Sequence, residues 1–266
     1  MTNKISIPKV EVPTDNYFLA ESDIYKETQT KAKEKFKDSK AYKTIMNGIN
    51  FENGTGSQFF FNTELNLHLP KNKRVILLED LERIYSSSEA DNLFDGSFYT
   101  DTPEIILRTE TASLDKNKQI LEHLVKQVKG AGYKFSFQNP LRISGLELVK
   151  DDNKDNEYGI SLKIGKDTRI INDERFDYKN NDIKLGKQTR NLWTKENGLS
   201  GLYLDRNAVL NADNGNLDNS YYSGRVVVTD AEGVGAQNFE IENLIDEKIA
   251  KLVSLRQEYL DKIESI

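Results

Sequence analysis

The sequence predicts an α+β fold, and three features of the chain lead to this class. Two stretches, 22–46 and 114–129, carry the spacing of charged and apolar residues that is typical of amphipathic helices. Short apolar runs separated by polar loops follow from 133 to 230 and predict strands. A third helical pattern occupies 238–266. Separate runs of helix and of short strands are characteristic of α+β proteins.

The N-terminal part, 1–50, combines an extended segment with a helix. Residues 5–19 alternate Pro, Val and Ile with polar residues, which predicts extended structure. Ser22 is the expected N-cap of the helix that follows. The charges of this helix are spaced for a solvent-facing surface, and its apolar side chains form only a narrow stripe: Ile24, Tyr25, Ala32, Phe36, Tyr42 and Ile45.

The next segments read as strands. Residues 57–69 alternate from Phe61 through Leu69, which predicts a strand. Residues 74–87 predict a strand that leads into a short helix, and 103–109 predicts another strand after Pro103.

The helix at 114–129 has the clearest pattern. Ser113 can cap it, and Gly130 and Gly132 are expected to end it. One face carries its apolar side chains: Ile120, Leu121, Leu124, Val125 and Val128. Short strands are then predicted at 133–137, 141–149, 158–164, 168–171, 190–194, 198–205 and 224–230.

The segment 236–266 predicts a C-terminal amphipathic helix. Its apolar positions follow steps of three and four residues: Ile241, Ile245, Ile249, Leu252, Leu255, Tyr259, Ile263 and Ile266. Such a stripe must be buried. It either packs on its own domain or pairs with copies of itself as a coiled coil, so a homo-oligomer through 238–266 is one expectation.

Composition limits the function classes. The chain of 266 residues has a net charge of -6, and an acidic protein repels phosphate, so we expect no nucleic-acid partner. It has no cysteine, which excludes thiol catalysis, disulfides and cysteine-based metal sites. No apolar run reaches the roughly 20 residues of a membrane span. The N-terminal residues lack the apolar core of a secretory signal.

The candidate catalytic and metal motifs are weak. Asp151, Asn153 and Asp155 have the spacing of a calcium loop, but Asn156 and Leu162 stand where Gly and Glu are needed. His68 and His123 are isolated in a predicted strand and a predicted helix. We therefore expect no catalytic residue, no metal site and no cofactor.

The stretch 202–228 has an unusual composition. From 203 to 223, 14 of 21 residues are Asn, Asp, Ser, Tyr or Gly. Leu202, Leu204, Leu210 and Leu217 are expected to be buried anchors, with the polar side chains exposed. Tyr with Ser, Gly and Asn is the chemistry of antibody paratopes. The alternative is an ordinary solvated loop rich in Asn and Asp.

Residues 190–233 resemble the variable region of proteins that are diversified by diversity-generating retroelements, notably those of archaea and their viruses. The segments 8–36, 98–110 and 141–152 are similar to the same group. The resemblance implies a C-type-lectin-like domain over 51–235 with a variable region at about 202–223. It also implies a reverse transcriptase that copies a template with errors at adenines, which turns Asn codons into codons for Asp, Ser, Tyr or Gly.

The chain departs from this family in two respects. The helix pattern at 238–266 follows the variable region, which many members place at the C-terminus. The lectin calcium signatures EPN and WND are missing, so calcium-dependent sugar binding is not carried over.

The resemblance implies a non-enzymatic protein that binds a variable protein or glycan ligand on a cell surface, and that is itself placed on a virion or a cell. The expected contacts are Tyr203, Asp205, Asn207, Asn211, Asp213, Asn214, Asn216, Asp218, Asn219, Ser220, Tyr221 and Tyr222. Two alternatives stay open. One is a structural or scaffold virion protein multimerised by the C-terminal helix, and the other is a glycan-active enzyme with a carboxylate pair.

Overall fold

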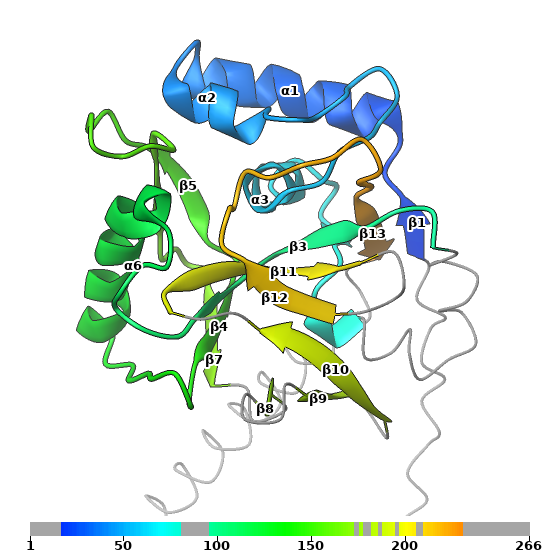
Figure 1. Cartoon of the computed structure of the whole chain (residues 1–266). Coiled ribbons are helices and arrows are strands. Elements are labelled where there is room, and N and C mark those ends of the chain that lie inside the picture. The colour runs from blue at the N-terminus through cyan, green and yellow to red at the C-terminus, as the bar shows by residue number, and fades with distance from the viewer. Residues whose placement is uncertain are drawn as a thin grey trace, which may run out of the picture.

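The computed structural model describes residues 17–80, 96–172, 176–177, 182–185, 188–194, 197–205 and 210–230. Helices and mainly antiparallel sheets are both present, so the α+β class is confirmed. Helices α1 (Ser22–Phe36), α2 (Lys40–Ile45) and α3 (Phe59–Asn66) lie above the main sheet in Figure 1, and α6 (Lys118–Gly130) lies at the left. The C-terminal helix predicted at 238–266, and most of the extended segment predicted at 5–19, fall outside the described residues.

The N-terminal helical pattern forms two helices, α1 (Ser22–Phe36) and α2 (Lys40–Ile45). The break falls at Lys37, whose φ is 53°, and Ser39 then caps α2 by accepting a hydrogen bond from the Tyr42 backbone N–H. The prediction of Ser22 as N-cap of α1 is wrong by one residue. The cap is Glu21, whose side chain makes no capping hydrogen bond.

The strand predicted at 57–69 is wrong, because this segment contains helix α3 (Phe59–Asn66). Phe59, Phe60 and Phe61 are consecutive and all buried, so the helix is covered on every side. A helix without a polar face shows no 3.6-residue pattern, and its alternating residues imitated a strand. The Gln58 side chain fixes its start by accepting hydrogen bonds from the backbone N–H groups of Phe60 and Phe61.

The main sheet has eight strands in the order β7-β4-β3-β11-β12-β10-β9-β8. Their bounds are β3 Thr100–Leu107, β4 Leu141–Ser144, β7 Arg169–Asn172, β8 Phe176–Asp177, β9 Asp182–Leu185, β10 Gln188–Thr194, β11 Leu199–Leu204 and β12 Leu210–Asn214. β10 and β12 are parallel, and the other neighbours are antiparallel. Pro103 lies in the central strand β3 because the pairing with β11 is irregular there, between the Gly201–Ile105 and Tyr203–Asp101 pairs.

Two smaller sheets complete the fold. β1 (Tyr17–Leu19), β13 (Val227–Asp230) and β2 (Lys73–Val75) form one sheet with β13 in the centre, so the two ends of the described chain pair with each other. β5 (Glu147–Lys150) and β6 (Ile160–Lys163) form a hairpin. The strand predicted at 141–149 is divided at Gly145, where φ is +67° and an added Cβ would lie 2.3 Å from the Asp167 carbonyl oxygen.

The helix predicted at 114–129 is present as α6 (Lys118–Gly130), preceded by a 3₁₀ turn, Asp115–Asn117. The prediction of Ser113 as its cap is wrong, since Asn117 holds that position without a capping hydrogen bond. Its predicted end is confirmed, with Gly132 at φ +87°. The Tyr133 N–H bonds the Val128 carbonyl and the Gly132 N–H bonds the Lys129 carbonyl, which is a Schellman motif.

The strand predictions for 103–109, 158–164, 168–171, 190–194, 198–205 and 224–230 are confirmed in type by β3, β6, β7, β10, β11 and β13. The strand predicted at 133–137 does not form, and only an isolated bridge joins Ser136 to Asn139. β12 was not predicted.

No helix among the described residues is both long and apolar enough to cross a membrane.

Candidate ligand-binding surface

The four leucines of the stretch 202–223 are buried as predicted. The exposed fractions of Leu202, Leu204, Leu210 and Leu217 are 0%, 1%, 0% and 2%. Leu202 and Leu204 lie in β11, Leu210 begins β12, and Leu217 follows the end of β12. The four buried leucines therefore anchor the stretch to the protein interior at four positions along its length.

The exposure predicted for the polar side chains is correct only in part. Asp205, Tyr221 and Tyr222 are exposed, whereas a second group is half-buried: Tyr203, Asp213, Asn216, Asn219 and Ser220. Asn207 and the side chain of Asn214 lie outside the described part of the structure.

Asn211, Asp218 and Ser223 correct the prediction, since they are buried, with exposed fractions of 5%, 6% and 9%. Asn211 lies within the sheet, where β12 pairs with both β10 and β11. Asp218 is held by an ion pair, because Lys116 Nζ lies 2.6 Å from its Oδ1. Asn211 inside the sheet and Asp218 in a partly buried ion pair therefore already serve the fold.

The backbone of 215–217 is held by two buried side chains from elsewhere in the chain. Asn117 Nδ2 donates to the Gly215 carbonyl oxygen over 2.7 Å. The Tyr158 hydroxyl donates to Asn117 Oδ1 over 2.7 Å and accepts from the Leu217 backbone N–H over 3.3 Å. Burial raises the pKa of Tyr158, so this hydroxyl remains a donor at neutral pH.

The backbone of 220–221 is held in the same way. The Tyr99 hydroxyl accepts from the Tyr221 backbone N–H over 2.7 Å and donates to the Ser57 carbonyl over 3.0 Å. Ser220 Oγ accepts from the Ser57 backbone N–H over 3.0 Å and donates to the Gly48 carbonyl over 3.2 Å. The predicted contact residue Ser220 therefore also serves as an anchor.

Two further contacts fix the end of the segment. The Tyr25 hydroxyl accepts from the Val226 backbone N–H over 3.1 Å and donates to the Gly56 carbonyl over 2.9 Å. At Gly224 an added Cβ would lie 2.5 Å from the Ser57 backbone nitrogen, so only glycine allows this close approach. Four buried residues outside the stretch thus define the path of 215–226: Asn117, Tyr158, Tyr99 and Tyr25.

Tyr221 and Tyr222 are the most exposed aromatic side chains of the segment, at 58% and 83%. A strand would direct them to opposite faces, but this segment is a turn, and both are exposed. The Tyr221 ring packs edge-on against Tyr99, with ring centres 6.2 Å apart, and its hydroxyl accepts from Asn219 Nδ2. These two contacts favour one orientation of the Tyr221 side chain.

The structure brings together one cluster that no sequence pattern indicated. His123 of α6 lies 3.0 Å from Ser161 Oγ of β6, and Ser161 donates to Asp151 Oδ2 over 2.8 Å. These are the residue types of a nucleophilic triad, but here the serine bonds the carboxylate itself. A triad requires the carboxylate to orient the far side of the imidazole. Hydrogen bonds from Asn156, Asn153 and Ser161 lower the pKa of Asp151 despite the opposing effect of desolvation, so it is a weak base.

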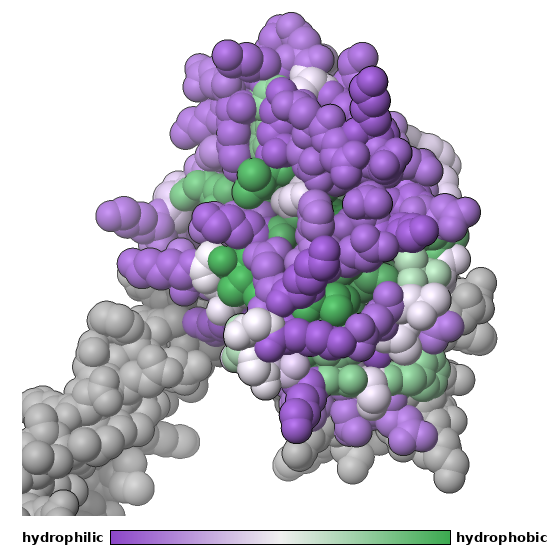
Figure 2. All heavy atoms as spheres, turned by 90° about the vertical axis from the view of Figure 1, so that its left-hand side faces the viewer, coloured by the Kyte–Doolittle hydropathy of each residue, from purple (hydrophilic) through white to green (hydrophobic). Residues whose placement is uncertain are grey.

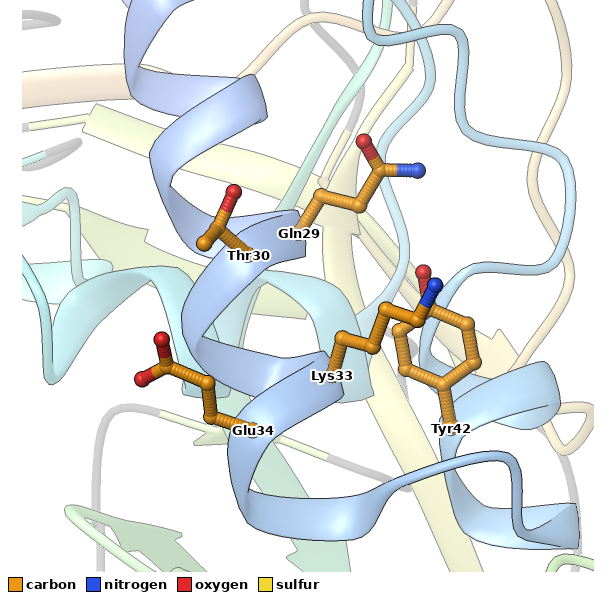
Figure 3. Close-up of a pocket in the computed structure, with 5 residues that line it drawn as sticks. All are labelled: Gln29, Thr30, Lys33, Glu34 and Tyr42. Atoms are coloured by element: carbon orange, nitrogen blue, oxygen red, sulfur yellow. The ribbon is translucent and has the colours of Figure 1, made fainter.

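A pocket of about 350 Å³ lies beside α1 and is lined by Gln29, Thr30, Lys33, Glu34 and Tyr42. Figure 3 shows Lys33 reaching toward the Tyr42 ring, while Glu34 points away. None of these residues belongs to 202–228. On the side of the molecule that carries α6, apolar side chains are divided into small groups by polar ones (Figure 2).

Within the described ranges, no group of three His, Asp or Glu side chains is placed to hold a metal ion. Family models give no match to this chain, and comparisons with curated proteins and with solved structures give none either. The candidate surface therefore rests on its own geometry: a tightly held backbone that carries exposed tyrosines and half-buried polar side chains.

Proposed function

We propose that this is a non-enzymatic ligand-binding protein whose surface residues in 203–223 are diversified by a retroelement to recognise variable ligands. One observation carries the proposal. The path of 215–226 is set by side chains outside the diversified stretch and by buried leucines inside it. Exposed residues such as Tyr222 can then change without loss of the fold. Two parts of the proposal, the diversification and the C-type-lectin-like fold, rest on the resemblance of residues 190–233 to the variable regions of retroelement-diversified proteins.

The exposed tyrosines are the expected centre of binding. Aromatic anchors supply much of the energy at protein interfaces, on the order of 2 kcal/mol or more for a hot-spot residue. Tyr221 is already packed on Tyr99, so binding would cost little of its conformational entropy. The ligand we propose is a protein or glycan on a cell surface, bound without a metal.

Two matched libraries test the separation of fold from recognition. The first varies Asn219, Tyr221 and Tyr222, and the second varies the buried Leu204, Leu210 and Leu217. Displayed on phage, most members of the first library should remain protease-resistant, and most members of the second should not. Selection of the first library against cell-surface extracts should then yield binders that resist EDTA.

Equal loss of folded protein in both libraries would overturn the proposal, because recognition residues would then be structural. The DNA around the coding sequence gives an independent check. A nearby near-copy of the segment for 202–223 that differs only at adenines, beside a reverse transcriptase, is the expected arrangement. The scaffold alternative depends on 238–266, which lies outside the described residues.

A further inference from the structure

Carboxylates gather around one phenol where β3, β11 and β12 meet. Tyr203 is the Cα partner of Asp101 on one side and of Asn211 on the other, so these three side chains share a face of the sheet. Asp213, two residues after Asn211, points to the same face, and its Oδ1 accepts from the Tyr203 hydroxyl over 3.1 Å. Burial raises the pKa of Tyr203, and the charges of Asp213, Asp205 and Asp101 raise it further.

A second observation at this place concerns hydrogen bonds that are not made. Asp101 is only 3% exposed, and its Oδ2 has no hydrogen-bond partner. Asn62 is fully buried, and its Oδ1 also has no partner, although its Nδ2 donates to the Asp101 carbonyl oxygen over 2.6 Å. Buried polar atoms are nearly always paired. Asn62 Oδ1 is an acceptor, and Asp101 Oδ2 is one when Asp101 is ionised, so a donor would satisfy both atoms in that state.

The chemistry of the donor follows from its surroundings. When Asp101 is ionised, its Oδ2, the Asp213 carboxylate and the Tyr203 hydroxyl oxygen can all accept hydrogen bonds, and the Tyr203 hydroxyl already donates to Asp213. A metal ion is disfavoured, because the described residues place no three metal-binding side chains together. An organic cation donates several hydrogen bonds and complements the negative charge.

We propose that Asp101, Asp213 and Tyr203 form a subsite for an organic cation, the side chain of a lysine or arginine on a protein partner. This inference rests on the proposed function and narrows its ligand from protein or glycan to a protein with a basic side chain at the contact.

The proposal includes a proton transfer to solvent. Burial raises the pKa of Asp101 well above its usual range, against a smaller opposing effect of its hydrogen bond with Ser57, so burial favours the protonated form of this carboxyl in the free protein. A bound cation favours the carboxylate, and the Asp101 proton leaves to water as the cation enters. Affinity for a cation should therefore rise with pH.

The test uses two small probes and the full-length chain. N-acetyl-lysine-N-methylamide carries an ammonium, and the same molecule acetylated on Nε is neutral. Titration followed by NMR should show at least tenfold tighter binding of the cationic probe, and tighter binding at pH 8 than at pH 6. Asp213→Asn should weaken the cationic probe at least tenfold. Asp155→Asn removes an exposed carboxylate elsewhere and should leave binding unchanged.

Asp101→Asn should remove the pH dependence of binding. If this variant does not fold, Asp213→Asn and the comparison of the two probes still decide whether the cation subsite exists. Equal affinity for the two probes, no binding of the cationic probe at millimolar concentration, or no effect of Asp213→Asn would each overturn the subsite. If library selection still yields ligands that require Tyr221 or Tyr222, the proposed function stands and only the cation subsite fails.

Discussion

Asn117 shows how one buried amide holds the candidate surface. Its Nδ2 bonds the Gly215 carbonyl and its Oδ1 accepts from Tyr158, which in turn bonds the Leu217 N–H. Asn117→Ala would leave buried partners unsatisfied, and we expect a loss of about 1–3 kcal/mol in the free energy of unfolding. Urea denaturation measures this change. Asn219→Ala, in the same surface segment, should change it by less than about 0.5 kcal/mol. Equal effects would contradict the assigned role.

Asp101 predicts the pH dependence of stability. Burial raises its pKa in the folded state, so between the unfolded and folded pKa values the folded protein binds more protons than the unfolded chain. Its contribution is fully present below the unfolded pKa, near 4, and is lost as pH rises toward the folded pKa. Asp101→Asn should flatten the fall of the melting temperature between pH 4 and 8, and Asp155→Asn should not. Identical slopes in wild type and Asp101→Asn would refute this.

At the scale of elements, β12 and the segment after it combine buried anchors with exposed side chains. Leu217→Ala should cost about 2–5 kcal/mol, since Leu217 is only 2% exposed. Tyr222→Ser, at a side chain that is 83% exposed, should cost less than about 0.5 kcal/mol. Thermal denaturation of the two variants separates these roles. A large loss from Tyr222→Ser would show that the turn needs its tyrosine.

Composition alone leads to the expectation that the polar residues of β12 can be replaced without loss of stability, and the position of β12 in the sheet revises it. Joint replacement of Asn211, Asp213 and Asn214 would be neutral if all three were surface residues. Asn211 is buried between β10 and β11, so the triple variant should be clearly less stable than Asp213→Asn alone. The melting temperatures of the two proteins give the comparison. Equal values would mean that replacing Asn211 costs no stability, as expected for a surface residue.

At the scale of the whole molecule, β13 pairs with β1 and β2, so the described fold closes on itself before residue 231. Deletion after Gly235 should therefore leave the core folded. If 238–266 forms a coiled coil between copies, sedimentation should show a smaller species for the deletion variant than for the full chain. A full-length chain that is monomeric at micromolar concentration would instead mean that this stripe packs within one molecule.

Local patterns predicted those elements whose residues face both core and solvent. The α6 stripe is of this kind, because a half-buried element must repeat its apolar residues with its own period. The pattern failed at α3, which is buried on all sides, and at β12, whose Asn and Asp residues resemble a loop. Sheet position, not local propensity, makes β12 a strand.

The sequence by itself determined the α+β class, the buried leucines and the concentration of Asn, Asp and Tyr in 203–223, since these depend on residue type and local spacing. Only the tertiary structure decided which polar residues serve the fold and which stay exposed at the surface. Asp218 forms an ion pair with Lys116, whereas Tyr222 is exposed. The same holds for Asp101, which meets Tyr203 only because β3 and β11 pair across about a hundred residues of chain. Such partners are distant in sequence, and no local pattern encodes them.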